Sequence, residues 1–179
     1  SLSDVSNVRL NMIASSLQSN GPIAVRYPAG CIPDVDIPNA GEPLTIGRGR
    51  IMRKGQDVAI LSLGTRLHDA LRAAERLSVK GVSTTVADAR FVCPLDEELV
   101  SQLAQNHEVL LTIEYLARQG FLRGGLDVQV MALPNTLLHH GTREEQIKLA
   151  GLSTSHIVTQ ALAALSWANT QTKVFALAS

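Results

Sequence analysis

Four apolar segments of strand length recur along this chain, each followed by a turn. The clearest extends from Asp57 to Thr65, where a continuous apolar run follows an acidic first residue and stops at Gly64. Continuous apolar runs of this length are typical of strands buried on both faces of a sheet. The other three segments lie at 82–87, 109–113 and 128–133.

Amphipathic patterns typical of helices lie between and after these strands. We expect Thr65 to cap a helix that ends at Gly81 and has one apolar face, formed by Leu67, Ala70, Leu71, Ala74 and Leu77. A second helix is expected to start at Pro94, with acidic residues in its first turn that complement the helix dipole. Strands that alternate with helices in this way predict an α/β fold with an open, mostly parallel sheet flanked by helices and right-handed crossovers.

Two further helices are expected after the last strand. Thr142-Arg143-Glu144-Glu145 matches a capping box, and Gly151 ends the short helix that it starts. Ser153 is expected to cap a final helix with an apolar face of Ile157, Val158, Ala161, Leu162 and Leu165. Residues 169–179 carry no strong signal and are predicted to be a tail.

The first 46 residues differ in character from the rest. A helical stripe of Val8, Met12, Ile13 and Leu17, which Ser3 or Asp4 could cap, is followed by a predicted strand at 23–27. Prolines are dense from residue 31 to 46, which predicts a linker between domains. Residues 1–30 are therefore expected to be the helix-strand end of a preceding domain, and 47–168 to form the main domain, starting with a charged edge strand at 47–55.

Composition and charge exclude several classes of function. Sixteen basic and sixteen acidic side chains cancel and aromatic residues make up 3%, so we expect no nucleic-acid or anionic membrane surface. The apolar runs are too short to span a bilayer, and nothing at the N-terminus is typical of a signal peptide. The two cysteines, Cys31 and Cys93, form no metal or disulfide motif, which favours a reducing compartment and small buried side chains. A start at Ser1 indicates a processed, cut or partial chain.

Polar residues at the ends of the predicted parallel strands are the candidates for chemistry, because ligands bind at the carboxyl edge of such sheets. They are Gly64-Thr65, Asp88-Ala89-Arg90 and Glu114. Asp88 and Arg90 are expected to pair structurally across a tight turn, and Glu114 is equally suited to a functional or a capping role. His139-His140 has poor spacing for metal ligands on a helix, and the chain lacks the glycine-rich dinucleotide, P-loop and nucleophile-elbow motifs.

Three ordered sets of residues resemble one enzyme family. Arg26-Tyr27-Pro28 with Gly30, the run Asp88 to Asp96 with its Arg-Phe-x-x-Pro-Leu-Asp pattern, and a finish of Leu133-Pro134, His140-Gly141, Gln146, Ala150-Gly151-Leu152 and Ser155-His156-Ile157 are similar to 1-deoxy-D-xylulose-5-phosphate synthases. These enzymes belong to the thiamine-diphosphate transketolase superfamily. The resemblance covers nearly the whole chain and implies a C-terminal portion, with residues 1–30 ending a pyrimidine-binding domain and 47–168 forming the transketolase C-terminal-like domain.

The resemblance also implies an activity. The family joins pyruvate, with loss of CO2, to glyceraldehyde 3-phosphate, using thiamine diphosphate and Mg²⁺, in the first step of non-mevalonate isoprenoid synthesis, and its product also supplies thiamine synthesis. It implies that the cofactor and metal ligands lie outside this chain, so no catalytic, cofactor-binding or metal-binding residue is assigned here, and the fragment alone is expected to be inactive. A homodimer, and a cytoplasmic location in bacteria or a plastid location in plants, are implied in the same way.

One site residue follows from the resemblance. The arginine of Arg-Tyr-Pro contacts the substrate phosphate in the family, which implies this role for Arg26; a guanidinium forks well onto phosphate oxygens. A structural ion pair is the alternative. Family members continue after Glu114 into a second acid and a glycine-rich loop, whereas Tyr115 follows here, so we expect residues of that loop to be missing between 114 and 115.

Other functions remain open from the sequence. One alternative is the C-terminal domain of a transketolase or of the β-subunit of a 2-oxo-acid dehydrogenase. Another is a non-catalytic assembly or dimerisation module with the same fold. A third is a regulator that binds a small anion or nucleotide at the helix N-terminus beside Gly64-Thr65.

Overall fold

A five-stranded sheet with helices on both faces forms the centre of the computed structural model, which describes residues 2–25, 40–113, 127–132 and 141–177. The helices are α1 (Leu2–Leu17), α2 (Leu67–Val79), α3 (Glu97–Asn106), α4 (Arg143–Leu149) and α5 (Thr154–Leu177), with a short 3-10 helix η1 (Gly64–Arg66). The strands are β1 (Arg50–Arg53), β2 (Val58–Ser62), β3 (Thr84–Asp88), β4 (Val109–Ile113) and β5 (Asp127–Met131). No helix in these ranges is long and apolar enough to span a membrane.

The strand order is β1-β3-β2-β4-β5. Strands β2 to β5 are parallel to one another, and β1 pairs antiparallel with β3 at one edge. The expected α/β class, the open and mostly parallel sheet and the charged edge strand within 47–55 are therefore confirmed. Strand β2 lies in the middle of the sheet and is buried along its whole length, as its continuous apolar run predicts.

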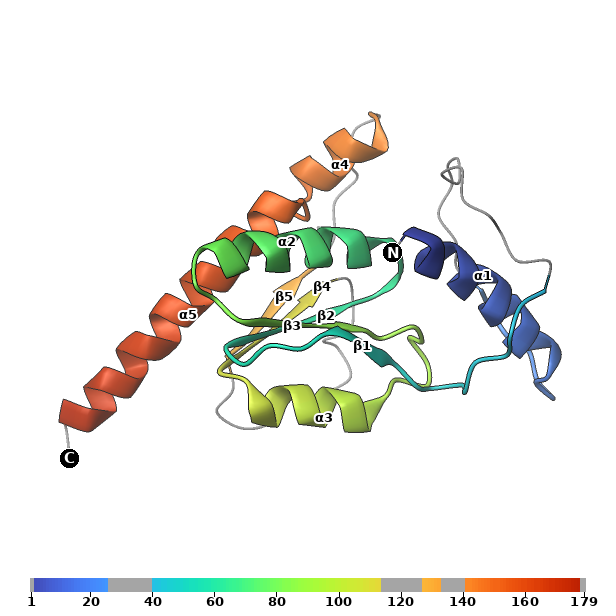
Figure 1. Cartoon of the computed structure of the whole chain (residues 1–179), viewed down its shortest axis with the longest axis horizontal. Helices are drawn as coiled ribbons and strands as arrows, with labels where there is room; N and C mark the ends of the chain where they lie inside the picture. The colour runs from blue at the N-terminus through green and yellow to red at the C-terminus, as the bar shows by residue number, and fades with distance from the viewer. Residues whose placement is uncertain (1, 26–39, 114–126, 133–140, 178–179) are drawn as a thin grey trace.

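The core has two layers, one on each face of the sheet. Helices α2 and α5 cover one face and α3 covers the other (Figure 1). Alternate residues of β2 enter the two layers, with Val58 and Ile60 facing α2 and α5 and Ala59 and Leu61 facing α3. The predicted apolar face of α2 is confirmed: Leu67, Ala70, Ala74 and Leu77 are buried and Leu71 packs at the margin.

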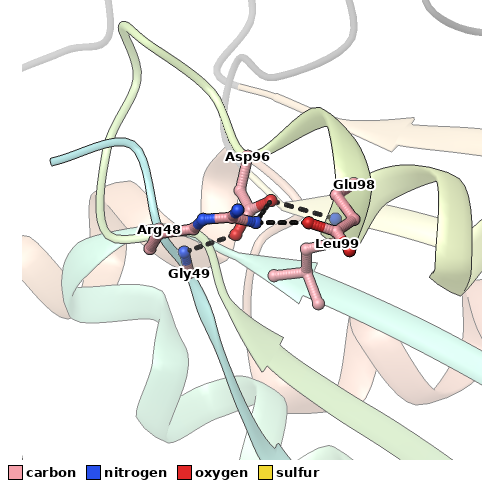
Figure 2. A network of polar contacts seen from close by, with 5 residues as sticks. All are labelled: Arg48, Gly49, Asp96, Glu98 and Leu99. Carbon is pink, nitrogen blue, oxygen red and sulfur yellow. Dashed lines mark hydrogen bonds and ion pairs between the residues drawn. The ribbon is translucent and has the colours of Figure 1, made fainter. Parts of the chain in front are cut away.

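The starts of two helices differ from the predictions. Thr65 caps no helix, because the chain passes through the turn η1 before α2 begins at Leu67, and neither helix start has a side-chain cap. Helix α3 begins at Glu97, so Pro94 precedes the helix, after a cis peptide bond with Cys93. The N-cap of α3 is Asp96, whose Oδ1 accepts a hydrogen bond from the Leu99 N–H at 3.0 Å (Figure 2).

The C-terminal helices follow the sequence signals closely. Thr142 and Glu145 form a reciprocal capping box at the start of α4, and Gly151 ends that helix with a φ of 70°. Helix α5 begins at Thr154, directly after the predicted cap Ser153. It extends to Leu177, beyond residue 168, where we expected a tail.

The N-terminal segment contains the expected helix, whereas the expected strand at 23–27 lies partly outside the described residues. Helix α1 begins at Leu2, so the proposed caps Ser3 and Asp4 lie inside it, and residues 23–25 are not in a strand. Ser15 and Asn11 of α1 bind the chain that leads to the sheet, because their side chains accept hydrogen bonds from the Leu44 and Glu42 N–H groups at 2.7 and 2.8 Å. Most of the predicted linker lies outside the described residues, and the division into domains stays a prediction.

Candidate functional site

Polar side chains gather at the carboxyl edge of the parallel strands. Ser62 ends β2 and pairs in register with Asp88, which ends β3, and with Ile113, which ends β4. Strand β1 runs in the opposite direction, so its first residue, Arg50, lies opposite Asp88 at the same edge. The edge where α/β sheets bind ligands therefore carries polar residues from three strands, namely Arg50, Ser62 and Asp88.

Asp88 links two arginines at this edge. Its Oδ2 accepts a hydrogen bond from Arg50 Nε at 3.2 Å, and its Oδ1 accepts one from the Arg90 backbone N–H at 3.1 Å. The Asp88 side chain is 5% exposed and that of Arg50 24% exposed, so the ion pair is largely shielded from water. We call Arg50, Ser62, Asp88 and Arg90 the edge cluster.

Arg90 is held in an uncommon backbone conformation. Its φ is 57°, the one positive value at a non-glycine position in the described chain, and the Phe91 N–H bonds to the Ala89 carbonyl at 2.6 Å across it. A hydrogen bond that spans three residues with φ positive at the centre defines a strained γ-turn. Non-glycine residues in such conformations persist where the surrounding structure enforces them, often at functional sites. Here the Ala89 N–H also binds the Ser62 carbonyl at 2.8 Å, which anchors the turn to the sheet.

The edge cluster has more positive charge and more donors than its own residues satisfy. The cluster holds two guanidinium groups and one carboxylate, and only the Arg50 guanidinium is bonded to that carboxylate. Within the described chain, three buried atoms of the cluster have no hydrogen-bond partner: Arg50 Nη2, Arg90 Nε and Ser62 Oγ. Burial and the positive charge of Arg50 lower the pKa of Arg90, and Asp88 offsets part of this effect. Each buried polar group without a hydrogen-bond partner costs about 1–3 kcal/mol. An anion bound here would accept hydrogen bonds from these groups and balance the positive charge, and so remove these costs.

A further arginine, Arg66, differs from Arg50 and Arg90, because it has no buried nitrogen without a hydrogen-bond partner. Arg66 is buried at the start of α2, and its Nη1 binds Asp69 Oδ2 at 2.6 Å. Asp69 Oδ1 accepts a further hydrogen bond from Thr154 Oγ1 at 3.0 Å, which joins α2 to α5. This ion pair is internally satisfied and structural, so the anion-binding potential of the edge belongs to Arg50 and Arg90.

The structure places some of the sequence-based candidates differently from our expectation, and others lie outside the described residues. The expected pairing of the Asp88 and Arg90 side chains is wrong: Asp88 pairs with the Arg50 side chain and with the Arg90 backbone, because the γ-turn brings the backbone N–H, and not the guanidinium, to the carboxylate. Arg50 was not among the sequence-based candidates, because only the antiparallel pairing of β1 brings it to this edge. Cys93 was expected to be buried and is exposed. Arg26, Cys31, Glu114 and His139-His140 lie outside the described residues.

Metal binding finds no support in the described ranges. No three His, Cys, Asp or Glu side chains come together there in a group that could hold a metal ion.

Comparisons with known proteins identify the family to which this fold belongs. The profile of the transketolase C-terminal domain matches residues 47–157. A 1-deoxy-D-xylulose-5-phosphate synthase from Rhodobacter capsulatus is 45% identical over 166 residues, which cover 86% of this chain and 26% of that protein. The chain thus spans about a quarter of the length of this relative.

Two solved structures have the same fold. A split-gene transketolase, described as an inactive β4 tetramer, matches with a TM-score of 0.60 and 24% identity over 69% of this chain and 44% of that one. A transketolase from Pichia stipitis matches with a TM-score of 0.51 and 16% identity over 72% of this chain and 21% of that one. At these identities the two matches support the fold alone. Because the family profile matches residues 47–157, which is more than half of the chain, the chain belongs to the transketolase C-terminal domain family.

Proposed function

We propose that this chain is the C-terminal part of a 1-deoxy-D-xylulose-5-phosphate synthase and that the edge cluster binds the phosphate of glyceraldehyde 3-phosphate. The main support for the phosphate site is the excess of buried arginine donors without a partner at the carboxyl edge of the sheet. The similarity to the Rhodobacter capsulatus synthase supports the reaction class.

The chemistry of the cluster suits a phosphate. Arginine donates through a planar fork that matches two phosphate oxygens, and both arginines retain unpartnered N–H groups. Arg90 and Arg50 would hold and orient the phosphate end of the aldehyde substrate. Arg26 is proposed as a further phosphate ligand on the strength of the resemblance.

The remaining parts of the proposal concern the longer protein. Thiamine diphosphate and Mg²⁺ would bind to residues outside this chain and supply the carbanion that attacks the aldehyde. The active form would be a homodimer, in the cytoplasm of a bacterium or in a plastid, and the product would supply isoprenoid and thiamine synthesis.

The reaction is tested on the longer protein that contains this chain. With pyruvate, glyceraldehyde 3-phosphate, thiamine diphosphate and Mg²⁺, it should release CO2 and form 1-deoxy-D-xylulose 5-phosphate. Turnover of xylulose 5-phosphate with ribose 5-phosphate in its place would identify a transketolase, and no turnover of either pair would favour the assembly module. The 179-residue chain alone should give no product, and clear synthase activity of that chain would contradict the proposal.

The site is tested on this chain by calorimetry. Glyceraldehyde 3-phosphate should bind more tightly than unphosphorylated glyceraldehyde, and Arg90→Gln should remove that difference. Arg76→Gln is the matched control, because Arg76 is an exposed arginine of α2. Equal binding of the two aldehydes, or equal effects of the two substitutions, would overturn the phosphate site.

A further inference from the structure

The Asp88 carboxylate contacts both arginines of the edge cluster, although it carries the same sign of charge as a phosphate. One oxygen holds the Arg50 guanidinium through Nε, and the other holds the backbone of the turn that presents Arg90. These two contacts involve β1 and the loop after β3, so a single side chain fixes groups from two separate segments.

We propose that Asp88 is a positioning residue for the phosphate site: it holds both arginines in the geometry in which their free donors meet one anion. The inference rests on the proposed phosphate site. Asp88 does not touch the ligand in this proposal. It acts through the Arg90 backbone and through the orientation of the Arg50 side chain.

Binding an anion costs less free energy when the arginine side chains are already ordered. A free arginine side chain loses rotamer freedom when it binds an anion, unless the guanidinium is already fixed. The strained turn at Arg90 also needs a restraint, and the Asp88 bond to the Arg90 N–H at 3.1 Å supplies one beside the Ala89–Ser62 bond. The carboxylate therefore favours anion binding through geometry while opposing it through charge.

Charge repulsion and positioning therefore predict opposite changes in phosphate affinity when Asp88 is replaced, which gives a test. Asp88→Asn removes the negative charge with little change in shape. If Asp88 acted through charge alone, phosphate would bind more tightly to the variant, because a repulsive charge beside the site is gone. If Asp88 positions the arginines, phosphate should bind about tenfold more weakly, because a neutral amide cannot hold both groups with charge-assisted hydrogen bonds.

The experiment is a calorimetric titration of the 179-residue chain with inorganic phosphate, with sodium chloride at matched ionic strength as the reference. Asp57→Asn is the control. Asp57 also accepts a backbone hydrogen bond, from the Ser83 N–H at 2.6 Å, but it precedes β2 at the opposite edge of the sheet. Both variants should lower the melting temperature, and only Asp88→Asn should weaken phosphate binding.

A second variant covers the case in which Asp88→Asn does not fold. Asp88→Glu keeps the charge and displaces the carboxylate by one methylene, so charge alone predicts unchanged binding and positioning predicts a loss of about tenfold. Unchanged or tighter binding in a folded Asp88 variant would overturn the inference and leave the phosphate site standing. Absence of phosphate binding by the unmodified chain would overturn the site itself, and the inference with it.

Discussion

Asp96 Oδ2 accepts a hydrogen bond from the Gly49 N–H at 2.9 Å, which joins the start of α3 to the approach to β1, forty-seven positions earlier (Figure 2). The other oxygen of the same carboxylate caps α3 through the Leu99 N–H. Gly49 lies so close to Leu99 and to the Asp88 carbonyl that a Cβ would meet both within 3.0 Å. The edge strand that carries Arg50 is thereby fixed against the helix layer, next to the edge cluster.

Replacing Asp96 should therefore remove two contacts at once. We expect Asp96→Ala to lower the free energy of unfolding by about 1–3 kcal/mol, since loss of an N-cap alone costs about 1 kcal/mol and the partly buried Gly49 N–H also loses its acceptor. Chemical denaturation measures the change. Glu97→Ala, an exposed acid in the first turn of the same helix, should change stability by no more than about 0.5 kcal/mol. Equal effects of the two substitutions would contradict the bridging role.

The turn before β2 depends on the absence of a side chain at Gly55. A Cβ there would lie within 2.6 Å of the backbone of Thr84 and Thr85, and the Gly55 N–H and carbonyl both bind Thr85 Oγ1. Gly55→Ala should destabilise the chain by about 1–3 kcal/mol, because backbone atoms must shift. Gly21→Ala, where nothing lies within 4 Å, is the control and should be neutral or slightly stabilising. A thermal melt compares the two, and equal melting temperatures would refute the close approach.

The layer between the sheet and helix α2 should be sensitive to truncation. Leu77 is 0% exposed, and Leu77→Ala should cost about 2–5 kcal/mol through lost burial and the cavity that remains. Val79, two residues on, is 89% exposed, so Val79→Ala should stay within about 0.5 kcal/mol. Urea denaturation of both variants checks the contrast, and a small effect at Leu77 would mean that α2 is not packed as described.

The capping box of α4 should make that helix sensitive to acid. Hydrogen bonds from the Thr142 backbone N–H and then from its hydroxyl hold the pKa of Glu145 below its ordinary value of 4.5. A carboxylate with a lowered folded pKa adds stability that is complete above the ordinary value and is lost as the pH falls through the lowered one. The destabilisation caused by Glu145→Ala should therefore be largest near neutral pH and shrink on acidification.

A side-chain NMR titration of Glu145 checks the direction of this shift. Its midpoint should lie below 4.5. A midpoint at or above 4.5 would show that the box does not favour the charged carboxylate.

The sequence by itself determined the local structure and the class of fold. The continuous apolar run of β2 allowed only a buried strand, the helical spacing of the apolar residues of α2 required one covered face, and Thr142 with Glu145 marked the start of α4. Each of these features depends on residues near one another in the chain, so periodicity and capping rules suffice to predict them.

Only the tertiary structure decided which residues form the edge cluster. Arg50 and Asp88 are 38 positions apart and meet because β1 is antiparallel to β3, and neither strand's own pattern specifies that pairing. The conformation of Arg90 was equally hidden, because a positive φ at a non-glycine residue opposes local preference and is imposed by the bonds to Ser62 and Asp88. The physical reason is the same in both cases: an anion site needs donors brought together across strands, and strand order is set by packing rather than by local sequence.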